Sequence, residues 1–237
     1  MILSNDCWMR DTCGKIKKGN TECLQADLFC KKLFRVDYLF NQSLLSIPQR
    51  KRVNFTFDTG YKDEAHDLQQ IKEIIIPIEE DIETFVNSGR NVYIHSANCG
   101  NGKTSWAIRL IQDYINAIWY KSDLKCRALF INVPRFLLTL KDNITDKSDY
   151  IQHIKDNVLE ADLVVWDEVG VKSLTTYEHE NLYNLINTRI DAGKSNIYTS
   201  NLSKEELEEK IGERLYSRIV NLSTEVLFIG VDKRGIK

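Results

Sequence analysis

The residues best suited to chemistry lie in a short glycine-rich segment that follows an apolar run. Gly100 and Gly102 flank Asn101, and Lys103 and Thr104 follow directly. Glycines at such positions let backbone N–H groups turn toward an anion, and the start of a helix adds its positive end. A lysine here reaches the β- and γ-phosphates of a nucleotide, and a threonine hydroxyl holds Mg²⁺. The pattern therefore predicts a loop that binds a nucleoside triphosphate.

The segments on both sides of this loop agree with the prediction. Residues 91–95 read as a short buried strand, and residues 105–118 have the apolar spacing of an amphipathic helix. Ala97 replaces the first glycine of G-x-x-x-x-G-K-[ST], which is tolerable if its φ is negative. A glycine-rich surface loop with a lysine is the alternative, and the flanking strand and helix argue against it. The predicted loop contacts to nucleotide are Ala97, Asn98, Cys99, Gly100, Asn101, Gly102, Lys103, Thr104 and Ser105.

A second apolar run ends in two carboxylates, Asp167 and Glu168. The run reads as a strand buried on both faces of a parallel sheet, and ligands collect at the C-terminal ends of such strands. There Asp167 would bind the Mg²⁺ shell, while Glu168 would orient and polarise the attacking water. Two solvated acids at a strand end are the alternative. Beside the phosphate loop, the pair favours ATP hydrolysis.

Further polar residues follow the acidic strand. Asn201 ends a predicted strand that should lie between the two nucleotide-binding strands, where an amide holds the attacking water or senses the γ-phosphate. It could equally cap the helix that starts near Ser203. Arg214 and Arg218 are four residues apart and share one helix face, so one could reach a neighbouring subunit's γ-phosphate. Solvated or ion-paired arginines are the alternative. Arg234 could contact nucleotide within the same subunit.

Four of the six cysteines lie in a short polar segment at the N-terminus. Such a segment has few core-forming residues and needs a cross-link or a metal to offset the entropy of ordering. No signal peptide or membrane span is expected, so the chain reads as cytoplasmic, where zinc is favoured over disulfides. The spacing C-x5-C-x9-C-x6-C lacks C-x2-C pairs, which leaves an iron–sulfur cluster or unligated cysteines as alternatives. The predicted zinc ligands are Cys7, Cys13, Cys23 and Cys30.

The 237 residues suffice for one α/β core and a small appendage. Alternating strand and helix patterns predict an α/β fold with a central parallel sheet flanked by helices. Helical spacing is expected over 29–45 and over 67–87, the second interrupted near Pro77, and a last strand over 226–230. Pro48 is expected to block helix in a basic linker. The predicted division is a Cys-rich module over 1–45, a linker over 46–60 and an ATPase domain over 61–237.

In this order the motifs resemble the AAA+ replicative helicase loaders of the DnaC/DnaI type, particularly phage versions. The resembling segments are the phosphate loop, residues 165–170, 199–203 and 212–218, and the final Gly-x-Asp-x-Arg. The resemblance implies a P-loop AAA+ core, with Asn201 as the first sensor and Arg234 as the second. It implies that Arg218 is the arginine finger and Arg214 its companion. The catalytic set is then Glu168, Asn201, Arg218 and Arg214, and Thr104 and Asp167 bind magnesium.

The resemblance also implies partners. An N-terminal zinc module would grip a hexameric replicative helicase, and the ATPase domain would self-associate and help to place the ring on single-stranded DNA. The basic excess of residues 1–52 permits nucleic-acid contact. Two alternatives remain: an IstB-like transposition ATPase that acts with a transposase, and an adaptor that binds nucleotide without hydrolysing it. Glu168 and the paired arginines argue against the adaptor.

Overall fold

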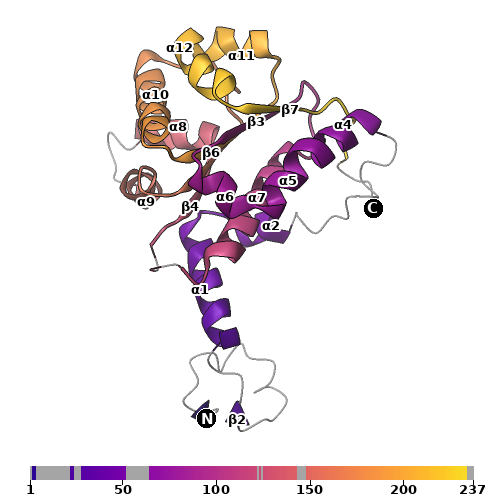
Figure 1. The fold of residues 1–237 in the computed structure, drawn as a ribbon. Helices are drawn as coiled ribbons and strands as arrows, with labels where there is room; N and C mark the ends of the chain where they lie inside the picture. The colour runs from indigo at the N-terminus through magenta and orange to yellow at the C-terminus, as the bar shows by residue number, and fades with distance from the viewer. Residues whose placement is uncertain are drawn as a thin grey trace.

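The protein is built around a parallel sheet that lies between two layers of helices (Figure 1). The computed structural model describes residues 2–3, 22–23, 28–51, 64–121, 123, 125–142 and 148–233. The sheet strands are β3 (Asn91–His95), β4 (Ala128–Asn132), β5 (Leu163–Asp167), β6 (Ser195–Ser200) and β7 (Thr224–Leu227). They lie in the order β4-β5-β6-β3-β7, and every neighbouring pair is parallel. The predicted parallel sheet is thereby confirmed.

The helices fall into two groups along the chain. Those before β3 are α1 (Leu28–Gln42), α2 (Ile47–Lys51), α4 (Ala65–Gln70), the π-helical turn η3 (Ile71–Ile75), α5 (Ile76–Glu80) and α6 (Ile82–Asn87). Those after β3 are α7 (Lys103–Ile118), α8 (Val133–Asp142), α9 (Asp149–Asn157), α10 (Thr176–Asp191), α11 (Lys204–Ile211), α12 (Glu213–Tyr216) and the π-helical turn η4 (Ser217–Asn221). A short antiparallel pair joins β1 (Ile2–Leu3) and β2 (Glu22–Cys23).

Strand residues divide between two hydrophobic cores because successive side chains on a strand point to opposite faces. Ile94 and Val165 belong to the core that α1, α4 to α6 and α7 cover. Tyr93 and Trp166 belong to the core under α8 to α12. Burial on both faces explains why these strands read as nearly continuous apolar runs.

The helical stretch before β3 changes form near Pro77, as predicted. The π-helical turn η3 ends two residues before this proline, and such a turn accommodates a residue that cannot donate a backbone hydrogen bond. A second break falls at Asp81, whose side chain accepts a hydrogen bond from the backbone N–H of Thr84. The prediction for Pro48 was wrong, because Pro48 lies in the first turn of α2, where its missing N–H costs little. The last strand also ends early, at Leu227, and the chain leaves the sheet after one further hydrogen bond, from the N–H of Phe228 to the carbonyl of His95.

The end of α1 is part of the main core. Leu39 and Leu45 are buried in the α7 layer, and the carbonyl of Ser43 accepts a hydrogen bond from the N–H of Phe130 at the outer edge of β4, the side away from β5. The predicted limits at residues 45 and 60 stay predictions, since residues 52–63 lie outside the described part of the chain. None of the described helices is long and apolar enough to cross a membrane.

A buried arginine fixes the acidic strand to its neighbour. Arg189 of α10 is fully buried, and its guanidinium donates to the carbonyl oxygens of Val158, Ala161 and Ser195 and to Oδ1 of Asn196. Several acceptors together replace the water that a buried cation loses. This contact ties α10 and the starts of β5 and β6 together, and the C-terminal ends of these strands carry the site described next.

Candidate nucleotide site

The phosphate loop connects β3 to α7 and is organised by its own polar groups. The Ser96 hydroxyl accepts hydrogen bonds from the N–H of Asn98 (3.0 Å) and from the side chain of Asn101 (2.6 Å). Gly100 and Gly102 have φ values of 75° and 104°, which only glycine adopts readily. Ala97 is not among the described non-glycine residues with positive φ, as its tolerance requires. The loop therefore has the backbone that the sequence predicts.

Lys103 begins α7 and folds back across this loop. Its ammonium donates to the carbonyl oxygen of Asn98 (2.7 Å) and to Oδ1 of Asn101 (3.1 Å), and only 5% of the residue is exposed. The cation is thus held at the N-terminus of a helix, where an anion is favoured. An incoming phosphate would exchange neutral oxygen partners of the lysine for charged ones, which make stronger hydrogen bonds.

Thr104, in the first turn of α7, contacts Asp167, the last residue of β5, although the two are 63 positions apart in the sequence. The Thr104 hydroxyl donates to Oδ1 of Asp167 at 2.8 Å, and the Thr199 hydroxyl donates to the same oxygen at 2.8 Å. Burial raises the pKa of the Asp167 carboxyl, and the hydrogen bonds from Thr199 and Thr104 act in the opposite direction. A buried carboxylate beside a hydroxyl is a donor set of hard oxygens that fits Mg²⁺.

Glu168 is held in an unusual backbone conformation. Its φ is 62°, in the left-handed region, and its N–H donates to the Thr199 hydroxyl at 2.9 Å. A non-glycine residue in this region costs on the order of 1–3 kcal/mol and points to a functional constraint. The turn presents the carboxylate to the side-chain amide of Asn132, which donates to Oε2 of Glu168 at 2.9 Å. Asn132 and Thr199 thus fix the side chain and the backbone of Glu168.

Asn201 lies where the sequence predicts, and one alternative for it is wrong. It directly follows β6, which lies between the acidic strand β5 and the phosphate-loop strand β3. The helix after it is capped by Ser203, whose hydroxyl accepts from the N–H of Glu206, so Asn201 is not the cap. Asn201 is half-buried beside the site. Its role as a water-holding or γ-phosphate-sensing residue stays a prediction.

The two arginines converge on a tyrosine of α10. The Arg214 guanidinium lies 4.7 Å from the centre of the Tyr183 ring, a cation–π contact. The nearby guanidinium groups of Arg214 and Arg218 lower the pKa of the Tyr183 phenol. The His179 ring lies nearly parallel to the Tyr183 ring, with centroids 6.2 Å apart and planes at 5°. Both arginines therefore lie close to Tyr183.

Some predicted site residues lie outside the described part of the structure. Arg234, Cys7 and Cys13 are not described, and of Cys23 and Cys30 only the backbone is placed, in β2 and α1. Within the described residues, no three His, Cys, Asp or Glu side chains gather in a way that could hold a metal. The zinc ligand set therefore stays a prediction.

Two residues of this region were not predicted from the sequence. Asn132 ends a strand as an ordinary polar residue, and Tyr183 is one of many aromatic residues in the chain. A signal existed only for Asn132, since polar residues at the C-terminal ends of parallel strands meet at one edge of the sheet.

Comparison with known proteins gives consistent results. The model of the family described as IstB-like ATP binding protein matches residues 39–221. The replicative helicase loader DnaC of Escherichia coli (strain K12) is 22% identical over 152 residues, which are 64% of this chain and 56% of that protein. The match thus spans little more than half the length of this curated relative.

Two solved structures share the fold at low identity. A crystal structure of the DnaC helicase loader has a TM-score of 0.50 and 21% identity, over 63% of this chain and 86% of that chain. A crystal structure of DnaI has a TM-score of 0.56 and 18% identity, over 75% and 93%. Together with the family match over most of the sequence, these results make the assignment. The chain belongs to the IstB-like ATP-binding protein family, with an AAA+ domain of the IstB/DnaC type.

Proposed function

We propose that this protein hydrolyses ATP and uses it to load a replicative DNA helicase onto single-stranded DNA. The observation that supports ATP hydrolysis most directly is the arrangement of Thr104, Asp167 and Glu168 at the C-terminal end of β5. Thr104 and Asp167 share a 2.8 Å hydrogen bond, and the adjacent Glu168 carboxylate is oriented by Asn132. Magnesium, held by Thr104 and Asp167, would neutralise charge on the phosphates.

The chain's own residues divide the remaining work. Lys103 and the loop N–H groups bind and orient the phosphates, and Glu168 positions a water and accepts its proton. Arg218, offered by a neighbouring subunit, would stabilise the charge that develops as the γ-phosphate leaves. Hydrolysis would then depend on contact between subunits.

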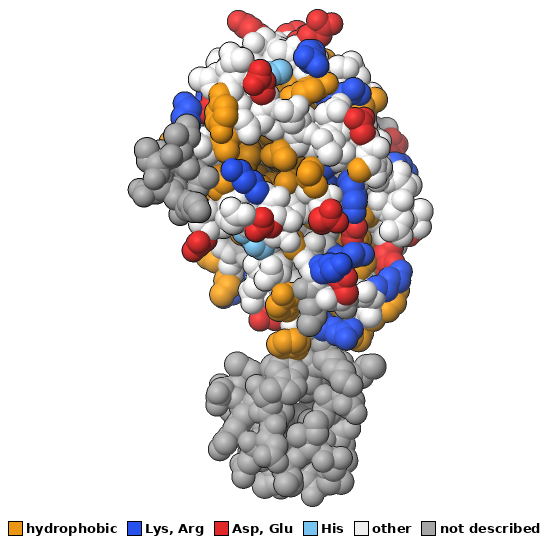
Figure 2. Space-filling model, turned by 90° about the vertical axis from the view of Figure 1, so that its left-hand side faces the viewer, with side chains coloured by type: hydrophobic (Ala, Val, Ile, Leu, Met, Phe, Trp, Pro, Cys, Tyr) orange, Lys and Arg blue, Asp and Glu red, His pale blue; other side chains and the backbone are white. Residues whose placement is uncertain are grey.

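Self-association is supported by an apolar surface next to the site. Figure 2 shows hydrophobic side chains gathered around a hollow on the face it displays. A shallow pocket beside Glu168 is lined by apolar residues that include Val133, Leu137 and Val171, and 48% of Val171 is exposed.

The loader role is supported by the DnaC relative, whose name describes a replicative helicase loader. Two measurements test this role. The first is binding of the protein to the hexameric replicative helicase from the same source, and the second is assembly of that helicase ring on circular single-stranded DNA in the presence of ATP. Glu168→Gln should hold ATP and the helicase without releasing phosphate. Unchanged phosphate release in Glu168→Gln would defeat the catalytic assignment. Full helicase assembly on DNA without this protein would defeat the loader assignment.

The family description also fits a transposition ATPase. That alternative predicts binding to a transposase and none to the helicase, so the same binding experiment separates the two. Lack of any ATP hydrolysis with helicase and DNA present would favour the non-hydrolysing adaptor. The N-terminal cysteines are proposed to bind zinc, and metal analysis of freshly purified protein should find about one Zn²⁺ per chain.

A further inference from the structure

The chain beyond β7 forms a strap over the phosphate loop. Residues 228–233 are called the C-terminal strap here. The N–H of Phe228 donates to the carbonyl of His95 (2.9 Å), which continues the sheet ladder, and the N–H of Lys233 donates to the carbonyl of Gly100 (2.9 Å). A Cβ added to Gly100 would collide with the Asp232 carboxylate. The strap therefore contacts the loop closely along its length.

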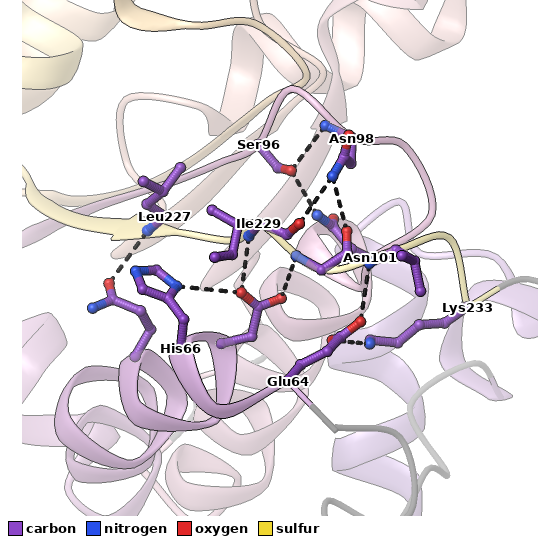
Figure 3. Close-up of polar contacts among 12 residues, drawn as sticks. Glu64, His66, Ser96, Asn98, Asn101, Leu227, Ile229 and Lys233 are labelled. Carbon is purple, nitrogen blue, oxygen red and sulfur yellow. Dashed lines mark hydrogen bonds and ion pairs between the residues drawn. The ribbon is translucent and has the colours of Figure 1, made fainter. Parts of the chain in front are cut away.

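A buried carboxylate of α4 holds the strap from the other side (Figure 3). Asp67 is fully buried, and its two oxygens accept hydrogen bonds from the N–H groups of Ile229 (2.8 Å) and Gly230 (3.0 Å). Glu64 accepts from the N–H of Val231 (2.9 Å) and pairs with Lys233. Hydrogen bonds to a buried carboxylate are strong, so the two peptides facing Asp67 have little freedom.

The same two residues, Ile229 and Gly230, also hold the phosphate loop. The side-chain amide of Asn98 donates to the carbonyl of Ile229 (2.9 Å) and to that of Gly230 (3.2 Å). The backbone carbonyl of Asn98 in turn accepts from the Lys103 ammonium. An unbroken series of contacts thus runs from Asp67 through the strap and Asn98 to the lysine that binds phosphate.

We propose that Asp67 is a positioning residue for the phosphate loop, acting through the C-terminal strap and Asn98. Its carboxylate sets the position of the peptides around Gly230, and these set the position of Asn98. Nucleotide affinity then depends on α4, an element outside the phosphate loop. This inference rests on the proposed nucleotide site and adds a residue to it.

The test compares nucleotide affinity with stability in the full chain. Asp67→Asn keeps the size of the side chain but replaces one acceptor by a donor that faces an N–H group. The affinity for ATP and the affinity for ADP should both fall about tenfold, because both nucleotides carry the β-phosphate that the loop is proposed to bind. Asn98→Ala should have a similar effect, and the double variant should be no worse than the stronger single variant.

Gln70→Met is the matched control. Gln70 lies on the same helix and accepts a hydrogen bond from the N–H of Leu227, just before the strap. Loss of this hydrogen bond in Gln70→Met should lower the melting temperature without changing nucleotide affinity. Calorimetric binding and thermal unfolding are measured on all four variants.

Each outcome decides the proposal. Unchanged ATP affinity in Asp67→Asn, or fully additive losses in the double variant, would overturn it. If Asp67→Asn does not fold, Asp67→Ser, which keeps one acceptor, replaces it. Failure of both to fold would assign Asp67 to stability alone and also overturn the proposal. Lack of ATP binding by the unmodified protein would instead defeat the proposed function, which separates the two failures.

Discussion

The side-chain amide of Asn132 lies between the two carboxylates that end β5, 2.9 Å from Oε2 of Glu168 and 3.5 Å from Oδ2 of Asp167. Its oxygen accepts the N–H of Arg135 at the start of α8. One amide thus joins the helix that follows β4 to the carboxylate proposed to activate water. The geometry makes Asn132 a positioning residue for Glu168.

Asn132→Asp should separate these two contacts. Aspartate keeps the acceptor for the Arg135 N–H but loses the donor and adds a third negative charge beside Asp167 and Glu168. Like charges raise the proton affinity of the cluster and push the Glu168 carboxylate away. We expect single-turnover ATP hydrolysis to fall at least about tenfold, with the melting temperature nearly unchanged.

Asn132→Ala is the companion variant, since it removes the donor without adding charge. It should hydrolyse ATP faster than Asn132→Asp. Turnover in Asn132→Asp equal to that of the unmodified protein would show that Glu168 needs no partner at this position.

The location of the arginine finger is tested by mixing two inactive proteins. Arg218→Ala should bind ATP normally and hydrolyse it about a thousandfold more slowly. Glu168→Gln should also be inactive. In a mixed assembly, Arg218 of a Glu168→Gln subunit meets an intact Glu168 in its neighbour, so an equimolar mixture should recover up to about a quarter of full activity.

This recovery is specific to action between subunits. A mixture that stays inactive, although the two proteins assemble together, would place Arg218 in its own subunit's site. Nearly full turnover by Arg218→Ala alone would remove it from catalysis.

Tyr183 is expected to support the same step. Tyr183→Phe keeps the ring beneath Arg214 and removes the hydroxyl whose pKa both guanidinium groups lower. If this hydroxyl helps to orient Arg218, its loss misplaces a catalytic group, which is costly. We expect kcat to fall about tenfold with the ATP dissociation constant unchanged.

Tyr177→Phe is the matched control on the same helix, because Tyr177 is exposed and lies six residues earlier. Its turnover should equal that of the unmodified protein. If Tyr183→Phe slows the Arg218→Ala protein as strongly as it slows the unmodified one, Tyr183 does not act through Arg218.

Sequence spacing alone located the parts of the site that are local. Lys103 and Thr104 are defined by neighbours within a few residues, and Asp167 and Glu168 by the apolar run before them, so short patterns sufficed. The interleaving of β6 between β5 and β3 was also predicted, since right-handed crossovers and the motif order leave few arrangements.

The missed residues act across long separations. Asp67 and Ile229 are 162 positions apart, and no pattern in either segment indicates that a carboxylate meets two peptide N–H groups there. The prediction for Pro48 failed for a different reason. Proline breaks a helix only where an N–H is needed, and Pro48 lies in the first turn of α2, where it is not.

Asp113 on α7 predicts a pH dependence of stability. Burial, reinforced by the nearby Glu79 carboxylate and opposed by Arg109, raises the pKa of Asp113 to about 6 from 3.8. Oδ2 of Asp113 and Oε2 of Glu79 are both buried without a hydrogen-bond partner among the described residues. The folded state therefore binds this proton more tightly than the unfolded chain does. The resulting stability is fully present below pH 3.8 and is lost as the pH rises through about 6.

Asp113→Asn imitates the protonated acid and should remove this loss. At pH 7.5 we expect the variant to be more stable than the unmodified protein by about 1–2 kcal/mol, allowing for the partial exposure of the carboxyl. The advantage should shrink as the pH falls through 6 and vanish near pH 4. Denaturant unfolding of both proteins across this range measures it, with the exposed neighbour variant Glu80→Gln as the control. A constant difference at every pH would mean that Asp113 keeps an ordinary proton affinity, and that the buried carboxylate pair costs the fold nothing at neutral pH.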